Sequence, residues 1–330
     1  MTSDLSNYAG REQSYIKHEF LTQYLQAAAY KTLQGRSPTF NFVDAFAGPW
    51  QVSDTNFSDA SFDQALRTLE AVRADLAKNG RTSLKIRFCF CEKRVDAVAR
   101  LRQYAQEHSN FEIHVFSGAF EDNLAAIATA CRDGFTFTFI DPTGWNIQSE
   151  PILQFLRERN GEFLLNFMAE HVNRHAEYGQ VSESFGRFLA DPNWADEFKT
   201  LPSDWNNEER VLYLLKQKMK ATKAATYLPD FPIRKPREQR VKMRLILGTH
   251  SAKGLEVFRD VQYRVERREI KTRNQLRKDG DSQNSLFSDD EVAAMQQNAA
   301  GVGCPMFRQM AEERIVNLLT DNGDKRFDAI

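Results

Sequence analysis

Apolar residues recur along this chain with two different periods. Residues 14–33 carry Ile16, Phe20, Leu21, Tyr24 and Leu25 at helical intervals, which predicts an amphipathic helix. Further along, short runs rich in Phe, Val and Ile alternate with segments of helical period. The predicted strands are 40–48 with its turn, 85–93, 111–118, 135–142 and 161–168, and the predicted helices between them are 62–78, 95–107, 123–132 and 150–159.

Strands that alternate with helices of this length indicate βαβ units. The predicted fold class is therefore α/β, with a doubly wound, mostly parallel, Rossmann-like sheet and helices on both faces. Ligands of such sheets bind at the carboxyl ends of the strands. In this sequence those ends are DAFAGPW, CEKR, SGAFED, DPTGW and NFMAEH.

The rest of the chain is predicted in coarser outline. Residues 171–228 have helical character and are predicted to be an insertion, and a strand over 243–250 and a helix over 252–261 follow. Residues 261–270 fit either a late strand or more helix. Residues 278–290 read as a turn or linker, and 306–319 as a last amphipathic helix.

Composition places the chain among ordinary folded proteins. It has 330 residues, of which 42% are hydrophobic and 27% charged, with a formal net charge of -1; this excludes a disordered chain. No run of residues is long and apolar enough for a membrane helix, and the polar N-terminus lacks a signal-peptide core. Four cysteines show no zinc-binding spacing, so we expect buried free thiols in a reducing, cytoplasmic compartment. Cys89 and Cys91 alternate within a strand and should share one face.

The first predicted strand ends in Asp44, and a turn through Ala47 and Gly48 follows. A glycine lets the backbone approach a ligand closely, because no Cβ intervenes. The single glycine differs from the G-x-G-x-x-G fingerprint, and no P-loop is present. A ligand without a phosphate is therefore favoured over a dinucleotide, although an ordinary tight turn fits equally well.

Acidic residues mark the next two strand ends. Glu92 ends the second strand, where a carboxylate can accept both ribose hydroxyls of a nucleoside. After the third strand, Gly118 precedes Phe120 and Glu121, which could cover an adenine ring and contact its amino group. The alternatives are a solvated Glu92 and an ordinary helix start near Asp122.

The fourth strand ends in Asp141, followed by Pro142 and, after a glycine, by Trp145. Proline fixes the turn and so holds the preceding carboxylate at the strand tip. Such a carboxylate suits the orientation of a substrate group against a bound cofactor. The segment DPTGW resembles the D-P-P-Y signature of methyltransferases that act on amino groups, with Thr-Gly-Trp in place of Pro-Tyr.

Three further features are open to two interpretations. Lys17 and His18 on the first helix fit a solvated face or a ligand contact. His171 and His175 stand four apart after the fifth strand and could bind a metal, but no third ligand is evident, so no metal is predicted. Residues 234–278 hold ten more basic than acidic residues, which could bind the phosphates of RNA or DNA or merely offset acidic surface elsewhere.

The order of these motifs resembles the class I S-adenosylmethionine-dependent methyltransferases over residues 40–170. With KHEFLTQYL, NFM and LILGTHSAKGLEVFRDV added, nearly the whole chain is similar to the three-Cys-motif partner family (TcmP), whose members are methyltransferase-like. The family is named for a separate three-cysteine protein that resembles radical S-adenosylmethionine enzymes. The resemblance implies five parts: a helical lid (1–35), a cofactor-binding core (36–170), the insertion (171–228), the end of the core with the basic region (229–277), and a linker with a C-terminal helix (278–330).

The resemblance also implies site residues. The cofactor S-adenosylmethionine would contact Lys17, Asp44, Phe46, Ala47, Gly48, Pro49, Glu92, Lys93, Gly118, Phe120, Glu121 and Asp141. The catalytic residues would be Asp141, Pro142 and Trp145, and the substrate would contact Asn166, His171, Arg174 and Lys253. Trp50 stands where the commoner form of the first motif has a second glycine.

The leading hypothesis is therefore methyl transfer to an amino group of a nucleic-acid base, which Trp145 could stack on after base flipping. The alternative is a non-catalytic or complex-dependent partner subunit of the three-cysteine protein. A nuclease or defence-system role ranks lower, because no D-x-x-x-E-x-K cluster is visible.

Overall fold

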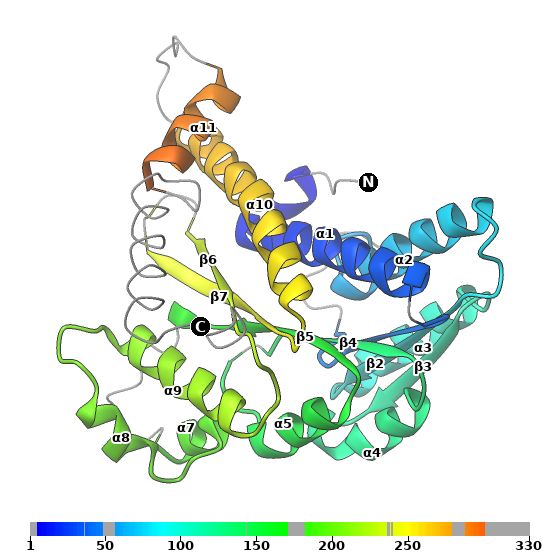
Figure 1. The fold of residues 1–330 in the computed structure, drawn as a ribbon, viewed down its shortest axis with the longest axis horizontal. Helices are drawn as coiled ribbons and strands as arrows, with labels where there is room; N and C mark the ends of the chain where they lie inside the picture. The colour runs from blue at the N-terminus through cyan, green and yellow to red at the C-terminus, as the bar shows by residue number, and fades with distance from the viewer. Residues whose placement is uncertain are drawn as a thin grey trace, which may run out of the picture.

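A computed structural model describes residues 5–35, 37–48, 57–142, 144–170, 182–235, 238, 240–278 and 288–300. Strands and helices alternate through the first half, as the sequence predicts (Figure 1). The strands are β1 (Thr39–Asp44), β2 (Lys85–Glu92), β3 (Glu112–Ser117), β4 (Phe135–Ile140), β5 (Gly161–Phe167), β6 (Asp230–Arg234) and β7 (Val241–Gly248). The helices are a 3-10 turn η1 (Leu5–Tyr8), α1 (Glu12–Gly35), α2 (Ser61–Lys78), α3 (Val95–Glu107), α4 (Phe120–Ala130), α5 (Ser149–Glu158), α7 (Ser182–Leu189), α8 (Trp194–Thr200), α9 (Asn207–Ala221), α10 (Ala252–Lys278) and α11 (Asp289–Ala300).

The sheet confirms the predicted doubly wound α/β fold. Its seven strands follow the order β3-β2-β1-β4-β5-β7-β6. The first five strands are parallel, and β7 runs antiparallel to both β5 and β6. The chain reverses its direction of travel across the sheet between β1 and β4, which makes that pair the topological switch point where ligands bind.

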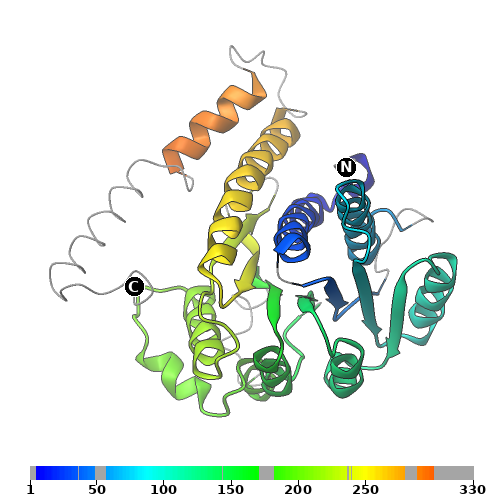
Figure 2. The same cartoon turned by 45° about the vertical axis from the view of Figure 1, so that its right-hand side comes forward.

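Helices cover both faces of the sheet (Figure 2), and a hydrophobic core lies between the sheet and each helical layer. Phe side chains of β1, β2 and β4 pack on one face against α1, α2, α3 and α10. The other face packs against α4, α5 and α7–α9. Cys89 and Cys91 both belong to this second core as buried free thiols, so their predicted shared face is confirmed.

Several boundaries differ from the sequence predictions. Helix α1 is largely buried and packs against α2 and α10, so it belongs to the helical layer instead of forming a separate lid. Residues 261–270 are helical, because α10 continues from Ala252 to Lys278. Strand β6 and helix α11 were not predicted. The predicted helix over 306–319 lies outside the described residues.

Helices α7–α9 form the described part of the predicted insertion. Their attachment to the sheet is ionic as well as apolar: Arg244 on β7 contacts both Glu208 on α9 and Asp230 on β6. A capping box between Asn206 and Glu209 fixes the start of α9. The insertion therefore has a defined position beside the carboxyl end of the sheet.

Candidate functional site

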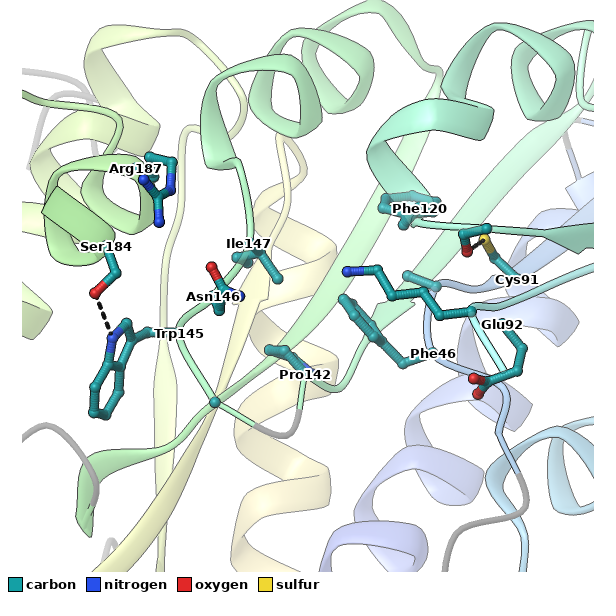
Figure 3. A pocket seen from close by; sticks show the side chains of 14 residues that line it. Phe46, Cys91, Glu92, Phe120, Pro142, Trp145, Asn146, Ile147, Ser184 and Arg187 are labelled. Carbon is teal, nitrogen blue, oxygen red and sulfur yellow. Dashed lines mark hydrogen bonds between the residues drawn. The ribbon is translucent and has the colours of Figure 1, made fainter. Parts of the chain in front are cut away.

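A cavity of about 610 Å³ lies at the carboxyl edge of the sheet (Figure 3). The loops that follow β1 to β4 form most of its wall, and α7 closes one side. Its volume falls within the range of cofactor and small-molecule sites. The lining residues are Ala45, Phe46, Cys91, Glu92, Lys93, Gly118, Phe120, Pro142, Gly144, Trp145, Asn146, Ile147, Ser184 and Arg187.

Glu92 supplies the only carboxylate among these described lining residues. It ends β2 and is only 5% exposed, and its Oε1 accepts the backbone N–H of Arg94 at 2.7 Å. This hydrogen bond holds the side chain at the strand tip. The carboxylate is thus placed to accept hydroxyl groups of a ligand in the cavity.

The apolar wall comes from Phe46, Phe120 and Ile147 (Figure 3). Phe120 packs edge-on against Phe155, with ring centroids 5.9 Å apart, so its own ring is held in place. Gly118 has a φ of +116°, a backbone conformation that favours glycine. Burial raises the pKa of the neighbouring Cys91 thiol to about 12, so Cys91 contributes to this wall as a neutral group.

Glu121 does not line this cavity within the described part of the chain. Its Oε1 accepts the backbone N–H of Gln148 at 2.9 Å, so one oxygen fixes the start of α5. Its Oε2 is buried with no hydrogen-bond partner among the described residues. The expected contact with an adenine amino group stays a prediction.

Asp44 is fully buried at the end of β1, beside the switch point. Its carboxylate accepts hydrogen bonds from the backbone N–H of Phe46 at 3.1 Å and from Ser61 Oγ at 2.7 Å. Burial is the main cause that raises its pKa to about 7, and the nearby charge of Asp141 adds to the rise. Lys17 opposes the rise.

A polar cluster joins α1 to the ends of β4 and β5. The Lys17 ammonium forms a salt bridge with Oδ2 of Asp141. Asn166 Nδ2 donates to the other oxygen, Oδ1, at 2.6 Å. The structure thus gathers Lys17, Asp44, Asp141 and Asn166, which the sequence analysis named on four separate elements. Lys17 is therefore engaged at the site and does not belong to a solvated helix face.

Trp145 connects the loop after β4 to the insertion. Its Nε1 donates to Ser184 Oγ at 3.0 Å (Figure 3). Its ring stacks on Phe185, with ring centroids 4.9 Å apart. The ring is therefore already packed against α7, which leaves less of it for stacking on a flipped base. Ser184 and Arg187 were missed by the sequence analysis, because no motif marks a helical residue that reaches a cavity.

Other predicted site residues divide into three groups. Ala47 and Gly48 follow β1 but do not line the cavity, and Ala47 donates its backbone N–H to Cys91 O at 2.9 Å. Pro49, His171 and Arg174 lie outside the described residues. The placement of Lys253 as a substrate contact is wrong: because β7 is antiparallel, Gly248 pairs with Phe163 near the start of β5, and α10 begins at the opposite edge of the sheet.

Seven of the fifteen cations of the basic region form salt bridges with carboxylates of the described residues. Residues of that region that form salt bridges with carboxylates are Arg234, Lys235, Arg240, Arg244, Lys253, Arg268 and Lys271. The hairpin between β6 and β7 carries Lys235 and Arg240 to the carboxyl edge, where both contact Glu170. The region is thus more nearly neutral than its sequence suggests.

Among the described residues, no helix is long and apolar enough to cross a membrane. No group of three or more His, Cys, Asp or Glu side chains in the same part of the chain could hold a metal ion. His171 and His175 lie outside the described residues.

No protein-family model and no curated protein matches the chain. Solved structures that resemble it include a protein provisionally assigned as a caffeoyl-CoA O-methyltransferase from Staphylococcus aureus, with 9% identity, 68% of this chain and 81% of that chain covered, and a TM-score of 0.31. A provisionally assigned sarcosine dimethylglycine methyltransferase from Galdieria sulphuraria has 11% identity, coverage of 75% and 88%, and a TM-score of 0.31. Mycolic acid cyclopropane synthase in its apo form has 8% identity, coverage of 68% and 87%, and a TM-score of 0.27. Scores this low carry no argument about function.

Proposed function

We propose that the chain is an S-adenosylmethionine-dependent methyltransferase that transfers the methyl group to an amino group of a nucleic-acid base. The observation that carries the proposal is the placement of Asp44 and Asp141 at the switch point, beside a cavity that Glu92 lines. The doubly wound sheet, with its switch point between β1 and β4, also supports the proposal, because sheets of this kind bind ligands at that point.

The residues present fit the cofactor chemically. Glu92 would accept its ribose hydroxyls, and Phe46, Phe120 and Ile147 would cover its purine. Asp44, buried directly before the lining residues Ala45 and Phe46, would stabilise its cationic methionine part through its charge. The cofactor supplies an electrophilic methyl group when bound.

The chain's own contribution is binding, orientation and charge. Asp141 would accept a hydrogen bond from the acceptor amine and so aim the nitrogen lone pair at the methyl group, which lowers the entropic part of the barrier. Asp44 is buried with a pKa of about 7, so it can hold or release a proton near neutral pH. Phe46, Pro142 and the insertion would limit the access of water.

Cations at the carboxyl edge support the choice of a nucleic acid. Lys235 and Arg240 lie on the β6–β7 hairpin, and Lys93 and Arg187 line the cavity. A phosphate would compete with Glu170 for the first two residues and with Glu183 for Arg187, whose Nη1 donates to Glu183 Oε1 at 2.5 Å. We therefore expect nucleic-acid binding that weakens strongly with salt.

Calorimetric titration of S-adenosylmethionine and S-adenosylhomocysteine tests the proposal. We expect micromolar binding to the wild type and affinity at least about tenfold weaker for Glu92→Gln, because hydrogen bonds to charged groups contribute about 1.5–3 kcal/mol. Glu158→Gln, an exposed carboxylate on α5, is the matched control and should bind like the wild type. Absence of binding at millimolar cofactor would overturn the proposal. Radiolabelled methyl transfer to RNA and DNA then tests the acceptor.

A partner subunit that is active only in a complex is the second candidate. The observation in its favour is that Lys17 occupies Asp141, the residue that would hold the acceptor. In this reading, a three-cysteine-motif partner would move α1 and free the carboxylate. Methyl transfer that requires the added partner, with cofactor binding already present in the isolated chain, would support it.

A further inference from the structure

Asn166 lies near the end of β5, where it pairs with Leu245 of β7 and adjoins Asp141. The side chain is only 2% exposed. A buried amide has two donor hydrogens and a carbonyl oxygen, and protein interiors rarely leave such groups without partners. The hydrogen-bond partners of Nδ2 and Oδ1 therefore show whether this amide lacks a partner that a ligand could supply.

The hydrogen bonds fix which way the amide points. Nδ2 donates to Asp141 Oδ1 at 2.6 Å and lies 3.5 Å from Met168 Sδ. An ionised carboxylate can only accept, so the nitrogen must face Asp141 and the oxygen must face away from it. The orientation of Asn166 is thus determined by chemistry, with no freedom to exchange nitrogen and oxygen.

Oδ1 of Asn166 has no hydrogen-bond partner among the described residues, although it is buried. The cost of leaving a buried acceptor without a donor is greater than the gain from an average hydrogen bond. A ligand or an ordered water can supply the missing donor. The nitrogen of the same amide is bonded to Asp141, the residue proposed to hold the acceptor amine, so the free oxygen belongs to the same polar cluster.

The contact made by Lys17 shows what kind of group this cluster takes. Lys17 lies on α1, and its ammonium donates a hydrogen bond to Oδ2 of Asp141. The cluster therefore already binds one N–H donor. Each carboxylate oxygen has a second lone pair, so Asp141 can accept from a further donor while Asn166 and Lys17 stay in contact.

We infer that Asn166 is a specificity-determining residue whose Oδ1 accepts the second hydrogen of a primary amino group held by Asp141. The inference rests on the proposed function and deepens it. An NH₂ group donates two hydrogens and satisfies both acceptors, whereas a hydroxyl donates one and leaves Asn166 Oδ1 unpaired. Sites with an unpaired polar group reject the poorer ligand strongly.

The test compares two cofactor analogues on the intact chain. Sinefungin carries a C–NH₃⁺ group where the cofactor carries its sulfonium methyl, so its amine enters the region of the acceptor. S-adenosylhomocysteine lacks that group and is otherwise similar. The ratio of their dissociation constants therefore reports the amine contact and does not depend on the fraction of protein that is folded.

We expect the wild type to prefer sinefungin by about tenfold, on the basis of a charge-assisted hydrogen bond. Asn166→Leu and the smaller Asn166→Ala should lower this preference about fivefold or more and leave the affinity for S-adenosylhomocysteine within about twofold. Lys17→Met should raise the preference, because it removes the charge repulsion between the Lys17 ammonium and the ammonium group of sinefungin. Asn41→Leu is the matched control: Asn41 is a buried asparagine in the amino half of β1, bonded to Asp133 O at 2.7 Å.

Asn41→Leu should lower thermal stability and leave the preference unchanged. An unchanged preference in both Asn166 variants, with normal binding of S-adenosylhomocysteine, would overturn the inference and leave the proposed function standing. An equal loss of both ligands in those variants would also overturn it, since that result indicates a purely structural role. Failure of the wild type to bind either analogue would instead overturn the proposed function.

Discussion

The Lys17 ammonium on helix α1 forms a salt bridge with the carboxylate of Asp141, which follows strand β4 124 residues later in the chain. The side chains are only 10% and 20% exposed, so solvent screens the pair weakly. Lys17 also lowers the pKa of Asp44, whereas burial and the charge of Asp141 raise it. One lysine therefore neutralises part of the charge of two aspartates that meet at the switch point.

Cofactor affinity should depend on pH through Asp44. Its pKa of about 7 means that the carboxylate gains a proton, and loses its negative charge, as the pH falls below 7. We expect S-adenosylmethionine to bind more weakly at pH 6 than at pH 8, since a cationic ligand loses a negative partner. Calorimetric titration across this range should show a flat profile for Asp44→Asn. An equally steep profile in that variant would assign the pH dependence to another group.

The docking of α1 should weaken in acid through His18. Burial lowers the pKa of His18 well below its usual value, and Nδ1 lies 2.9 Å from the hydroxyl of Tyr8. The unfolded chain binds a proton at His18 below about pH 6.5 and the folded chain does not, so this residue's contribution to stability falls as the pH falls through that value. We therefore expect the difference in unfolding free energy between the wild type and His18→Leu to shift against the wild type as the pH is lowered from 7.5 to 5.5. Urea denaturation of both proteins at the two pH values measures this difference.

Gly161 should not tolerate a side chain at the start of β5. A Cβ at this position would lie 1.8 Å from the carbonyl oxygen of Thr136 on the paired strand. Gly161→Ala must separate β4 from β5, and we expect it to reduce the unfolding free energy by about 2 kcal/mol or more, the range of overpacked cores. Gly35→Ala, where nothing lies within 4 Å of the added Cβ, is the control and should change stability little.

Replacing Trp145 by a smaller residue should weaken the attachment of the insertion to the core. Its hydrogen bond to Ser184 and its stack on Phe185 are contacts between the loop after β4 and α7. Trp145→Phe keeps a ring but loses the hydrogen bond, at a cost of about 1 kcal/mol. Trp145→Ala also loses the packing of a partly buried ring and should cost more than Trp145→Phe. Faster proteolysis of residues 182–221 in the order Ala, Phe, wild type would support this, and equal rates would contradict it.

The sequence predicted the first half of the fold well, because each strand is a short apolar run that ends in a turn residue. Asp44, Glu92 and Asp141 could be found for the same reason, since the ends of parallel strands share one edge. Lys253 was misplaced because nothing in its local sequence reveals that β7 is antiparallel. Strand β6 was missed because Asp230, Pro232 and Arg234 break the apolar pattern.

Contacts between distant segments were harder to predict. No spacing in the sequence indicates that Lys17 reaches Asp141, or that Arg187 on the insertion reaches the cavity. The charge count of residues 234–278 was also misleading, because carboxylates such as Glu19, Glu170 and Glu208 come from outside that region. Pairing of this kind depends on tertiary structure and leaves no local pattern.

Helix α1 carries side chains to three places within about two turns. Lys17 reaches the candidate site, Glu19 forms a salt bridge with Arg268 on α10, and the Tyr24 hydroxyl donates to Glu162 at the start of β5 at 2.8 Å. A helix is stiff over this length, so α1 rigidly links the candidate site to α10, the long helix against which α11 packs. A ligand that displaced Lys17 from Asp141 would therefore act on the helix that also holds Arg268 of α10, on the face of the sheet opposite the insertion.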